Sequence, residues 1–434
     1  MTVGRPRHFA RALIAGLAVT VGMTLGPAPF CSPATAAPVP PTTTPVTDHC
    51  PHRIDTPPPV DESEVVAPGD PTPTPLAVPE TPVGGEQLAA CGVVADPAVG
   101  PIPPALTSAG WLVADLDTGE VIAAKDPHGR YRPASTIKVL LALVALDELD
   151  LDTVITPTAE EWSTEGDSCG MGPGGRYTNR DLLTGLVMVS GNDCANALAR
   201  QLGGVDTALD KMNERAHALG ALDTRAASPS GLDAPGMSSS PYDLALIFRE
   251  AMHDSTFRSM IGMREYRFPG YPRRPDVPGD TDHPAYQMHT SNQLLLEGYP
   301  GMIGGKTGYT DDARKTYVGV TERSGRQIMV VEMFGLTVGT NSYWDQTKAL
   351  FDYGFRAPEG VTVGDLVTPP QAAAEASATT TVVPSPTAAP RTVTATGTGT
   401  DEPTRWSVRL LIGLVAALVS VLLLLVAMRL FSRR

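Results

Sequence analysis

A hydroxyl and an amine stand one helical turn apart in the stretch Ser135-Thr136-Ile137-Lys138. Side chains at positions i and i+3 share one face of a helix, so the lysine amine can reach the serine oxygen. The apolar run that continues to about Leu149 predicts a buried helix beginning at Ser135, and burial lowers the pKa of a lysine toward its neutral base form. A helix N-terminus also favours negative charge on a reacting oxygen. The pair indicates a serine nucleophile with a lysine base, although the short pattern alone also fits a helix cap and a surface lysine.

Two further groups could complete such a site. Ser190-Gly191-Asn192 follows an apolar helical segment and places a second hydroxyl and an amide on a loop. Lys306-Thr307-Gly308 ends a strand-like run, and its glycine leaves room for a ligand backbone beside the strand edge. Because the three groups occur in this order on a helix, a loop and a strand, we predict that they meet in one cleft.

Predicted strands and helices follow one another in a clear order around these three groups. A strand-like segment at 111–116, an Asp117-Thr118-Gly119 turn and a second segment at 120–124 predict a hairpin. Helical stretches fill 179–254, and strand-like runs and a last helix follow at 301–307, 315–322, 327–334 and 343–353. This series predicts an α+β fold, with one antiparallel sheet flanked by helices.

The motif set is similar to that of the penicillin-recognising serine enzymes. Within that group the chain resembles the low-molecular-mass D-alanyl-D-alanine carboxypeptidases of the peptidase S11 type. The resemblance covers roughly residues 105–355. Its supporting stretches are Arg132-Pro133-Ala134-Ser135, Gly191-Asn192-Asp193, Gly231-Leu232-Asp233-Ala234-Pro235-Gly236, Tyr299-Pro300-Gly301, Lys306-Thr307-Gly308-Tyr309-Thr310 and Asp352-Tyr353-Gly354-Phe355.

The resemblance implies a penicillin-binding transpeptidase or β-lactamase-like fold and an acyl-transfer reaction. Ser135 would attack the bond between the two terminal D-alanines of a peptidoglycan stem peptide, Lys138 would accept its proton, and Ser190 would pass a proton to the leaving amine. The substrate would be bound by Asn192, Lys306, Thr307, Gly308 and Tyr309. The backbone N–H groups of Ser135 and Tyr309 would form the oxyanion hole. The hydrolysis would limit cross-linking during cell wall synthesis, β-lactam antibiotics would acylate Ser135, and no metal or other cofactor is expected.

One departure from the family pattern concerns the terminal carboxylate of the substrate. Such carboxypeptidases often carry an arginine before the last helix, where this chain reads Asn341-Ser342-Tyr343. Thr307 would then contribute more to carboxylate binding, or Arg314 would substitute.

Two other functions fit parts of the pattern. A class A β-lactamase shares the three motifs but needs a glutamate after the second to activate the deacylating water, and no glutamate occurs between Glu214 and Glu250. A non-catalytic scaffold protein of the cell wall could retain the fold, although all three motifs are intact. Release of D-alanine from a pentapeptide mimic would separate a peptidase from a scaffold.

Both ends of the chain carry membrane signals. Residues 1–36 order basic, apolar and small residues as a cleaved secretory signal peptide does, with an uncleaved anchor as the alternative. Residues 410–428 are apolar and uncharged, which predicts a transmembrane helix followed by a cytoplasmic tail at 429–434. We therefore expect a single-pass protein of the bacterial cell membrane, with its catalytic domain on the extracytoplasmic face.

Composition divides the remainder into two arms and one domain. A Pro/Thr-rich extracytoplasmic arm at 37–104 and a Thr/Ala/Pro-rich tether at 368–404 lack periodicity, so both are expected to be disordered. The D,D-carboxypeptidase domain lies between them at 105–367. The net charge of −14 argues against a nucleic-acid partner.

Four cysteines remain after removal of the signal segment, and an even number in an exported chain suggests disulfides. Of the three possible connectivities we expect the sequence-local pairs, Cys50 with Cys91 and Cys169 with Cys194. Free buried thiols are the alternative.

Overall fold

The computed structural model describes residues 46–369. The expected signal peptide (1–36), transmembrane helix (410–428) and cytoplasmic tail (429–434) lie outside the described residues, as does nearly all of the tether. Within 46–369, none of the helices combines the length and apolar character that crossing a membrane requires.

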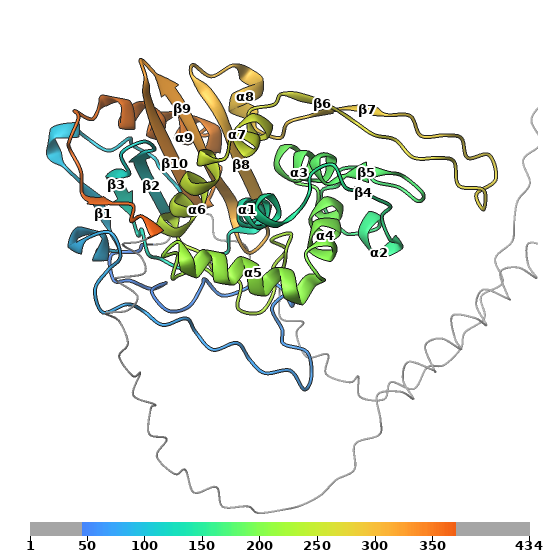
Figure 1. Ribbon diagram of the computed structural model, residues 1–434. Coiled ribbons are helices and arrows are strands. Elements are labelled where there is room, and N and C mark those ends of the chain that lie inside the picture. The colour runs from blue at the N-terminus through green and yellow to red at the C-terminus, as the bar shows by residue number, and fades with distance from the viewer. Residues whose placement is uncertain (1–45, 370–434) are drawn as a thin grey trace, which may run out of the picture. The chain divides into compact units, whose positions relative to one another are not determined.

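A seven-stranded sheet forms the centre of the domain (Figure 1). The strands follow the order β1-β3-β2-β10-β9-β8, and β11 also pairs with β3. Their bounds are β1 Val93–Ala95, β2 Gly110–Asp115, β3 Glu120–Lys125, β8 Met302–Thr310, β9 Arg314–Arg323, β10 Arg326–Gly335 and β11 Gly364–Asp365. Every pairing is antiparallel, which confirms the predicted α+β class.

Both faces of this sheet are buried. Successive side chains of a strand point to opposite faces, and every residue of β2 is buried. In β2, Leu112 and Ala114 pack into one hydrophobic cluster, whereas Trp111 and Val113 pack into the other. The alternation in β10 is the same, with Met329 in the first cluster. Helices must therefore cover the apolar side chains on both faces of the sheet.

The helices divide between these two faces. Their bounds are α1 Lys138–Glu148, α2 Ala159–Trp162, α3 Asn179–Met188, α4 Asn192–Gln201, α5 Val205–Ala218, α6 Pro241–His253, α7 Ser255–Ile261, α8 Gln293–Glu297 and α9 Tyr343–Arg356. Helix α9 covers one face through Leu350 and Phe351, and α6 packs on the other. Helix α1 is buried among α3, α4, α5 and α6, as its uninterrupted apolar sequence predicted.

Short elements complete the described chain. Three 3₁₀ helices occur at η1 Glu86–Ala89, η2 Pro97–Val99 and η3 Ala134–Ile137. Two small hairpins pair β4 Val154–Ile155 with β5 Tyr177–Thr178, and β6 Glu265–Phe268 with β7 Tyr286–His289. The second hairpin projects beyond the helices in Figure 1.

The predicted helix start at Ser135 differs in detail. Ser135 lies in η3, and the α-helix begins only at Lys138. Ala134 has φ 48°, a left-handed conformation in which a regular α-helix cannot continue. The local sequence predicted the helix and the face that Ser135 and Lys138 share. The 3₁₀ turn that leads into the helix depends on contacts with other elements.

Residues 46–92, which we call the strap, correct the expectation of a disordered arm at 37–104. The strap carries little regular structure besides η1, as its proline content indicates, but it is fixed along the domain (blue in Figure 1). The Cys50–Cys91 disulfide closes it, as predicted. Buried side chains of the domain supply hydrogen bonds to its carbonyls, among them Arg130 to Leu76. Residues 93–95 then enter the sheet as β1, so the folded unit begins well before residue 105.

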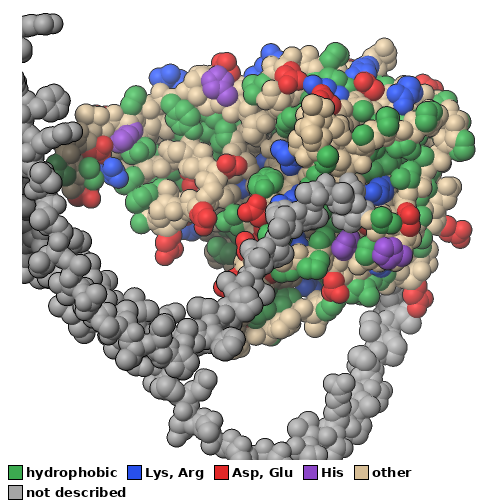
Figure 2. Space-filling model, turned by 180° about the vertical axis from the view of Figure 1, so that it is seen from behind, with side chains coloured by type: hydrophobic (Ala, Val, Ile, Leu, Met, Phe, Trp, Pro, Cys, Tyr) green, Lys and Arg blue, Asp and Glu red, His purple; other side chains and the backbone are tan. Residues whose placement is uncertain are grey.

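The exterior bears both signs of charge. On the face seen in Figure 2, Lys and Arg side chains are interspersed with Asp and Glu and do not gather into one basic patch.

Candidate active site

The amine of Lys138 lies at the centre of the candidate site. Its Nζ is 2.8 Å from Ser135 Oγ and 2.7 Å from Asn192 Oδ1, and it also donates to the carbonyl oxygen of Ser230. Lys138 is fully buried, and this burial, aided by the charge of Lys306, lowers its pKa well below the ordinary value. A neutral amine has two protons and one lone pair. It can therefore donate to Asn192 and Ser230 while accepting the hydroxyl proton of Ser135.

Ser190 presents a second hydroxyl from the turn between α3 and α4. Its backbone is left-handed, with φ 68°, and its side chain is buried. Within residues 46–369 its Oγ has no hydrogen-bond partner. A buried hydroxyl without a partner is costly, so a bound substrate that supplies one would be favoured.

Asn192, the first residue of α4, has both ends of its amide engaged. Its Oδ1 accepts from Lys138, and its Nδ2 donates to the carbonyl of Glu165 at 2.7 Å. The family resemblance implied that Asn192 binds the substrate. In the folded chain it lines the cavity and also orients the lysine base.

Strand β8 forms the other wall and is the last strand of the sheet path, so its outer edge can pair with an extended peptide. A Cβ at Gly308 would lie 2.8 Å from the backbone nitrogen of Ser135, so glycine is what allows this strand to approach the nucleophile. Thr307 Oγ1 lies 3.1 Å from Ser291 Oγ.

Lys306 is buried behind this edge. Burial lowers the pKa of its amine to about 7, and the nearby Asp167 carboxylate partly opposes that shift. Its Nζ donates to the carbonyl of Thr307 at 2.7 Å. Near neutral pH, Lys306 can thus carry a positive charge close to Lys138, whose pKa burial lowers well below its ordinary value.

A cavity of about 360 Å³ joins these groups. Six of the predicted residues line it, and Lys138 and Lys306 lie buried behind it. The six are Ser135, Ser190, Asn192, Thr307, Gly308 and Tyr309. Sequence analysis did not place Asp167, Ser291, Lys315, Tyr343 and Trp344 there. Asp167 and Ser291 lie in loops, and Lys315 lies at the start of β9. Tyr343 and Trp344 are the first two residues of α9. No common spacing marks these five residues in the sequence, so only the fold identifies them.

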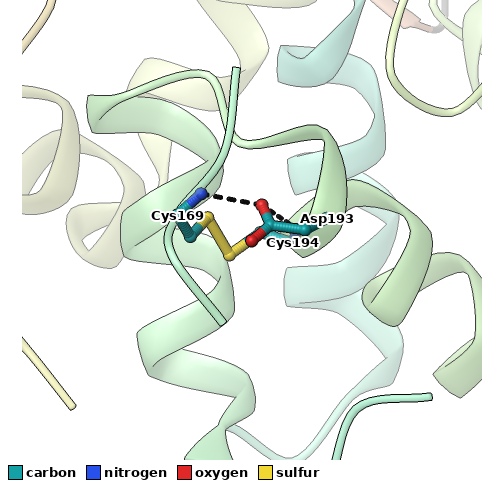
Figure 3. Close-up of side chains that lie close together, drawn as sticks. All are labelled: Cys169, Asp193 and Cys194. Carbon is teal, nitrogen blue, oxygen red and sulfur yellow. Dashed lines mark hydrogen bonds between the residues drawn. A yellow bond between two sulfur atoms is a disulfide. The ribbon is translucent and has the colours of Figure 1, made fainter. Parts of the chain in front are cut away.

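The Cys169–Cys194 disulfide, predicted from sequence proximity, fixes one rim of this cavity. Figure 3 shows the buried carboxylate of Asp193 beside it. Asp193 Oδ1 accepts from the backbone nitrogen of Cys169 at 2.7 Å, and Oδ2 accepts from Ser168 Oγ at 2.7 Å. The disulfide engages both sulfurs, and Asp193 is held by these donors. The cluster therefore fastens the loop that bears Asp167 to the start of α4.

Comparison with known proteins agrees with this arrangement. A family model described as peptidase S11, D-alanyl-D-alanine carboxypeptidase, matches residues 98–336. This chain belongs to the peptidase S11 family. The match includes all three motifs of this S11 protein and begins after the strap.

Individual relatives extend the comparison. The S11 protein is 47% identical over 271 residues to the D-alanyl-D-alanine carboxypeptidase DacB2 of Mycobacterium tuberculosis, covering 61% of this chain and 88% of the relative. It is 28% identical to DacF of Bacillus subtilis, covering 56% of this chain and 61% of DacF. Among solved structures, a penicillin-binding protein homolog from M. tuberculosis has 44% identity and a TM-score of 0.58, over 63% of this chain and 100% of its own. The Streptomyces K15 DD-transpeptidase has 26% identity and a TM-score of 0.54, over 59% and 100%.

Proposed function

We propose that this S11 protein hydrolyses the terminal D-Ala-D-Ala bond of peptidoglycan stem peptides through an acyl-enzyme on Ser135. One observation carries the proposal: a fully buried lysine amine lies 2.8 Å from the serine hydroxyl, beside a free strand edge. Family membership supplies the substrate class. Removal of the last D-alanine would limit cross-linking during cell wall synthesis.

In the acylation step Ser135 Oγ attacks the carbonyl carbon of the penultimate D-alanine, and its proton moves to the Lys138 amine. The negative charge that develops on the carbonyl oxygen is stabilised by the backbone N–H groups of Ser135 and Tyr309. One such donor typically contributes about 3 kcal/mol to transition-state stabilisation. The close approach of Gly308 to the Ser135 nitrogen is what brings the two donors together.

Departure of D-alanine requires a proton on its amine. Ser190 relays that proton from Lys138, and the charge of Lys306 favours the transfer. Water then hydrolyses the ester, with Lys138 again as the base. A β-lactam would acylate Ser135 by the same attack, its amide bond opening in place of the peptide bond.

The function is tested by incubating the purified protein with a pentapeptide that ends in D-Ala-D-Ala and measuring free D-alanine. We expect release of one D-alanine per peptide, and a mass increase equal to one β-lactam after exposure to penicillin. A protein that gives neither result is not a carboxypeptidase, and the scaffold interpretation would replace this one.

The carboxylate of the substrate needs a cation in this cavity. Arg314, considered from sequence, is 6% exposed and does not line the cavity, whereas the next residue, Lys315, does. Lys315 pairs with Tyr309 across β8 and β9, and Thr307 pairs with Tyr317, so Thr307 and Lys315 share one face of the sheet. We infer that Lys315 and the Thr307 hydroxyl hold the carboxylate together.

Replacing Lys315 with methionine keeps the length of the side chain and removes its charge. We expect KM for D-Ala-D-Ala peptides to rise about tenfold with kcat nearly unchanged, since one charge-assisted contact is lost. Steady-state kinetics should also show no such change for a substrate with a C-terminal amide. Lys211→Met, on α5 and remote from the cavity, is the control. An unchanged KM in Lys315→Met would contradict the assignment.

We propose further that residues 1–36 direct export and residues 410–428 anchor the protein in the bacterial cell membrane, with the domain on the extracytoplasmic face. The two disulfides support an oxidising compartment. A chain ending at residue 404 is expected to leave the membrane fraction, whereas the full chain stays there. Equal amounts of both chains in the membrane fraction would refute the anchor.

A further inference from the structure

The strap lies against the segment that leads to the nucleophile. Arg130, which is 1% exposed, donates to strap carbonyls of Ile54, Leu76 and Ala77 at 2.8 to 3.0 Å. Its Nε bonds Asp223 at 3.1 Å. The strap thus packs against a buried side chain five positions before Ser135.

The next contact is an ion pair closer to Ser135. Arg132 is also 1% exposed, and its Nε and Nη2 bond the two carboxylate oxygens of Glu64, the second at 2.6 Å. Its Nη1 donates to the carbonyl of Pro57 at 2.6 Å. A buried guanidinium depends strongly on such partners, so Glu64 largely determines where Arg132 lies.

The same stretch of strap also holds the turn after β8. Asp312 is buried, and its Oδ1 accepts from the backbone nitrogen of Val60 at 2.5 Å. Its Oδ2 accepts from Ser63 Oγ at 3.3 Å. Residues 57–64, which we call the clamp, therefore contact both Arg132 and Asp312.

These two contacts flank the proposed oxyanion hole. Arg132 lies three positions before Ser135, and Asp312 three positions after Tyr309. Between Arg132 and Ser135 the chain passes through the left-handed Ala134, the first residue of the short η3, and the regular α-helix begins only at Lys138. The spacing of the two donors thus depends on contacts from outside their own elements.

We propose that the clamp sets the distance between the backbone N–H groups of Ser135 and Tyr309, with Glu64 as the positioning residue that acts through Arg132. This role rests on the proposed function of Ser135. The clamp precedes residue 98, where the family match begins, so it lies outside the matched region. Misplacement of a reacting group by about 1 Å can cost on the order of 100-fold in rate.

The test uses Glu64→Gln in the full chain and the kinetics of acylation by a fluorescent penicillin. We expect the maximal acylation rate constant to fall about tenfold to 100-fold, while the dissociation constant of the preceding non-covalent complex stays the same, because the oxyanion hole acts on the transition state. Glu64→Asp, which keeps the charge, should recover part of the rate. Rates are measured on protein shown by circular dichroism to be folded.

Glu62→Gln is the matched control. It removes the same charge from the same strap, and the Glu62 side chain is exposed, with no partner among residues 46–369. We expect its acylation rate to equal that of the parent. A folded Glu64→Gln protein that acylates at the parent rate, or one that changes only the dissociation constant, would overturn the clamp proposal.

A second variant is used if Glu64→Gln does not yield folded protein. Asp312→Ala removes the other contact of the clamp and should lower the acylation rate constant severalfold. An unchanged rate constant in this variant would again overturn the proposal. Failure of the parent protein itself to be acylated would instead refute the proposed function, so the two failures are distinguishable.

Discussion

The Ser135→Ala variant is expected to form no covalent adduct with penicillin and to release D-alanine at least about 10⁴-fold more slowly than the parent. The hydroxyl is the only atom group removed, and the acyl-enzyme requires its oxygen. Because Ser135 lies in a short 3₁₀ turn and is partly exposed, the substitution should leave the fold intact. Intact-protein mass spectrometry after penicillin treatment measures the adduct directly.

The control for this variant is Ser259→Ala, which changes an exposed serine on α7, away from the cavity. We expect the full mass increase in Ser259→Ala and none in Ser135→Ala. An adduct that persists in Ser135→Ala on the same peptide, with peptide trimming at the parent rate, would show that another residue is the nucleophile.

Substitutions of Lys138 are expected to have the second large effect on the acylation rate. Lys138→Met removes the base, and Lys138→Arg keeps a charge but cannot accept a proton, since arginine stays protonated in proteins. We expect both variants to lose about 10³-fold or more in acylation rate, within the range for loss of a general base. Activity near the parent value in Lys138→Arg would exclude a base at this position.

The pH profile of the parent protein tests the same residue. Lys138 must be neutral to accept the proton, so activity rises as pH passes through its pKa, and burial places that rise well below the ordinary lysine range. Lys306 must be charged, and burial sets its pKa to about 7, so activity falls as pH increases beyond that value. Because the two amines interact, the two apparent pKa values of the resulting bell-shaped pH profile describe the pair of lysines and not either lysine alone. Lys306→Arg should move the falling limb to higher pH, and a profile that rises only above pH 10 would contradict a lowered Lys138 pKa.

The hydrogen bonds of the two buried amines, Lys138 and Lys306, indicate different roles. Its Nζ donates to the Thr307 carbonyl, and Lys138 Nζ bonds Ser135 and Asn192. Lys138 alone is therefore placed to take the nucleophile's proton, and Lys306 acts through its charge.

Features that depend on neighbouring positions could be predicted from the amino-acid sequence. The i, i+3 spacing of Ser135 and Lys138, the strand-like apolar runs that form β2 and β10, and the short cysteine separations are all local, and local geometry fixes what such patterns can form. The order of the three motifs then predicted one cavity, and the fold places them around it.

Contacts between distant segments could not be predicted before the fold was known. The Ser230 carbonyl on Lys138, Lys315 in the cavity and Glu64 on Arg132 each join residues without a common period or spacing. The proline-rich strap illustrates the reason. Its composition correctly predicts a chain that forms few internal hydrogen bonds, but whether such a chain is ordered depends on the partners that a folded neighbour offers. Here buried arginines and a disulfide provide them, and the sequence of the strap carries no sign of either arginine.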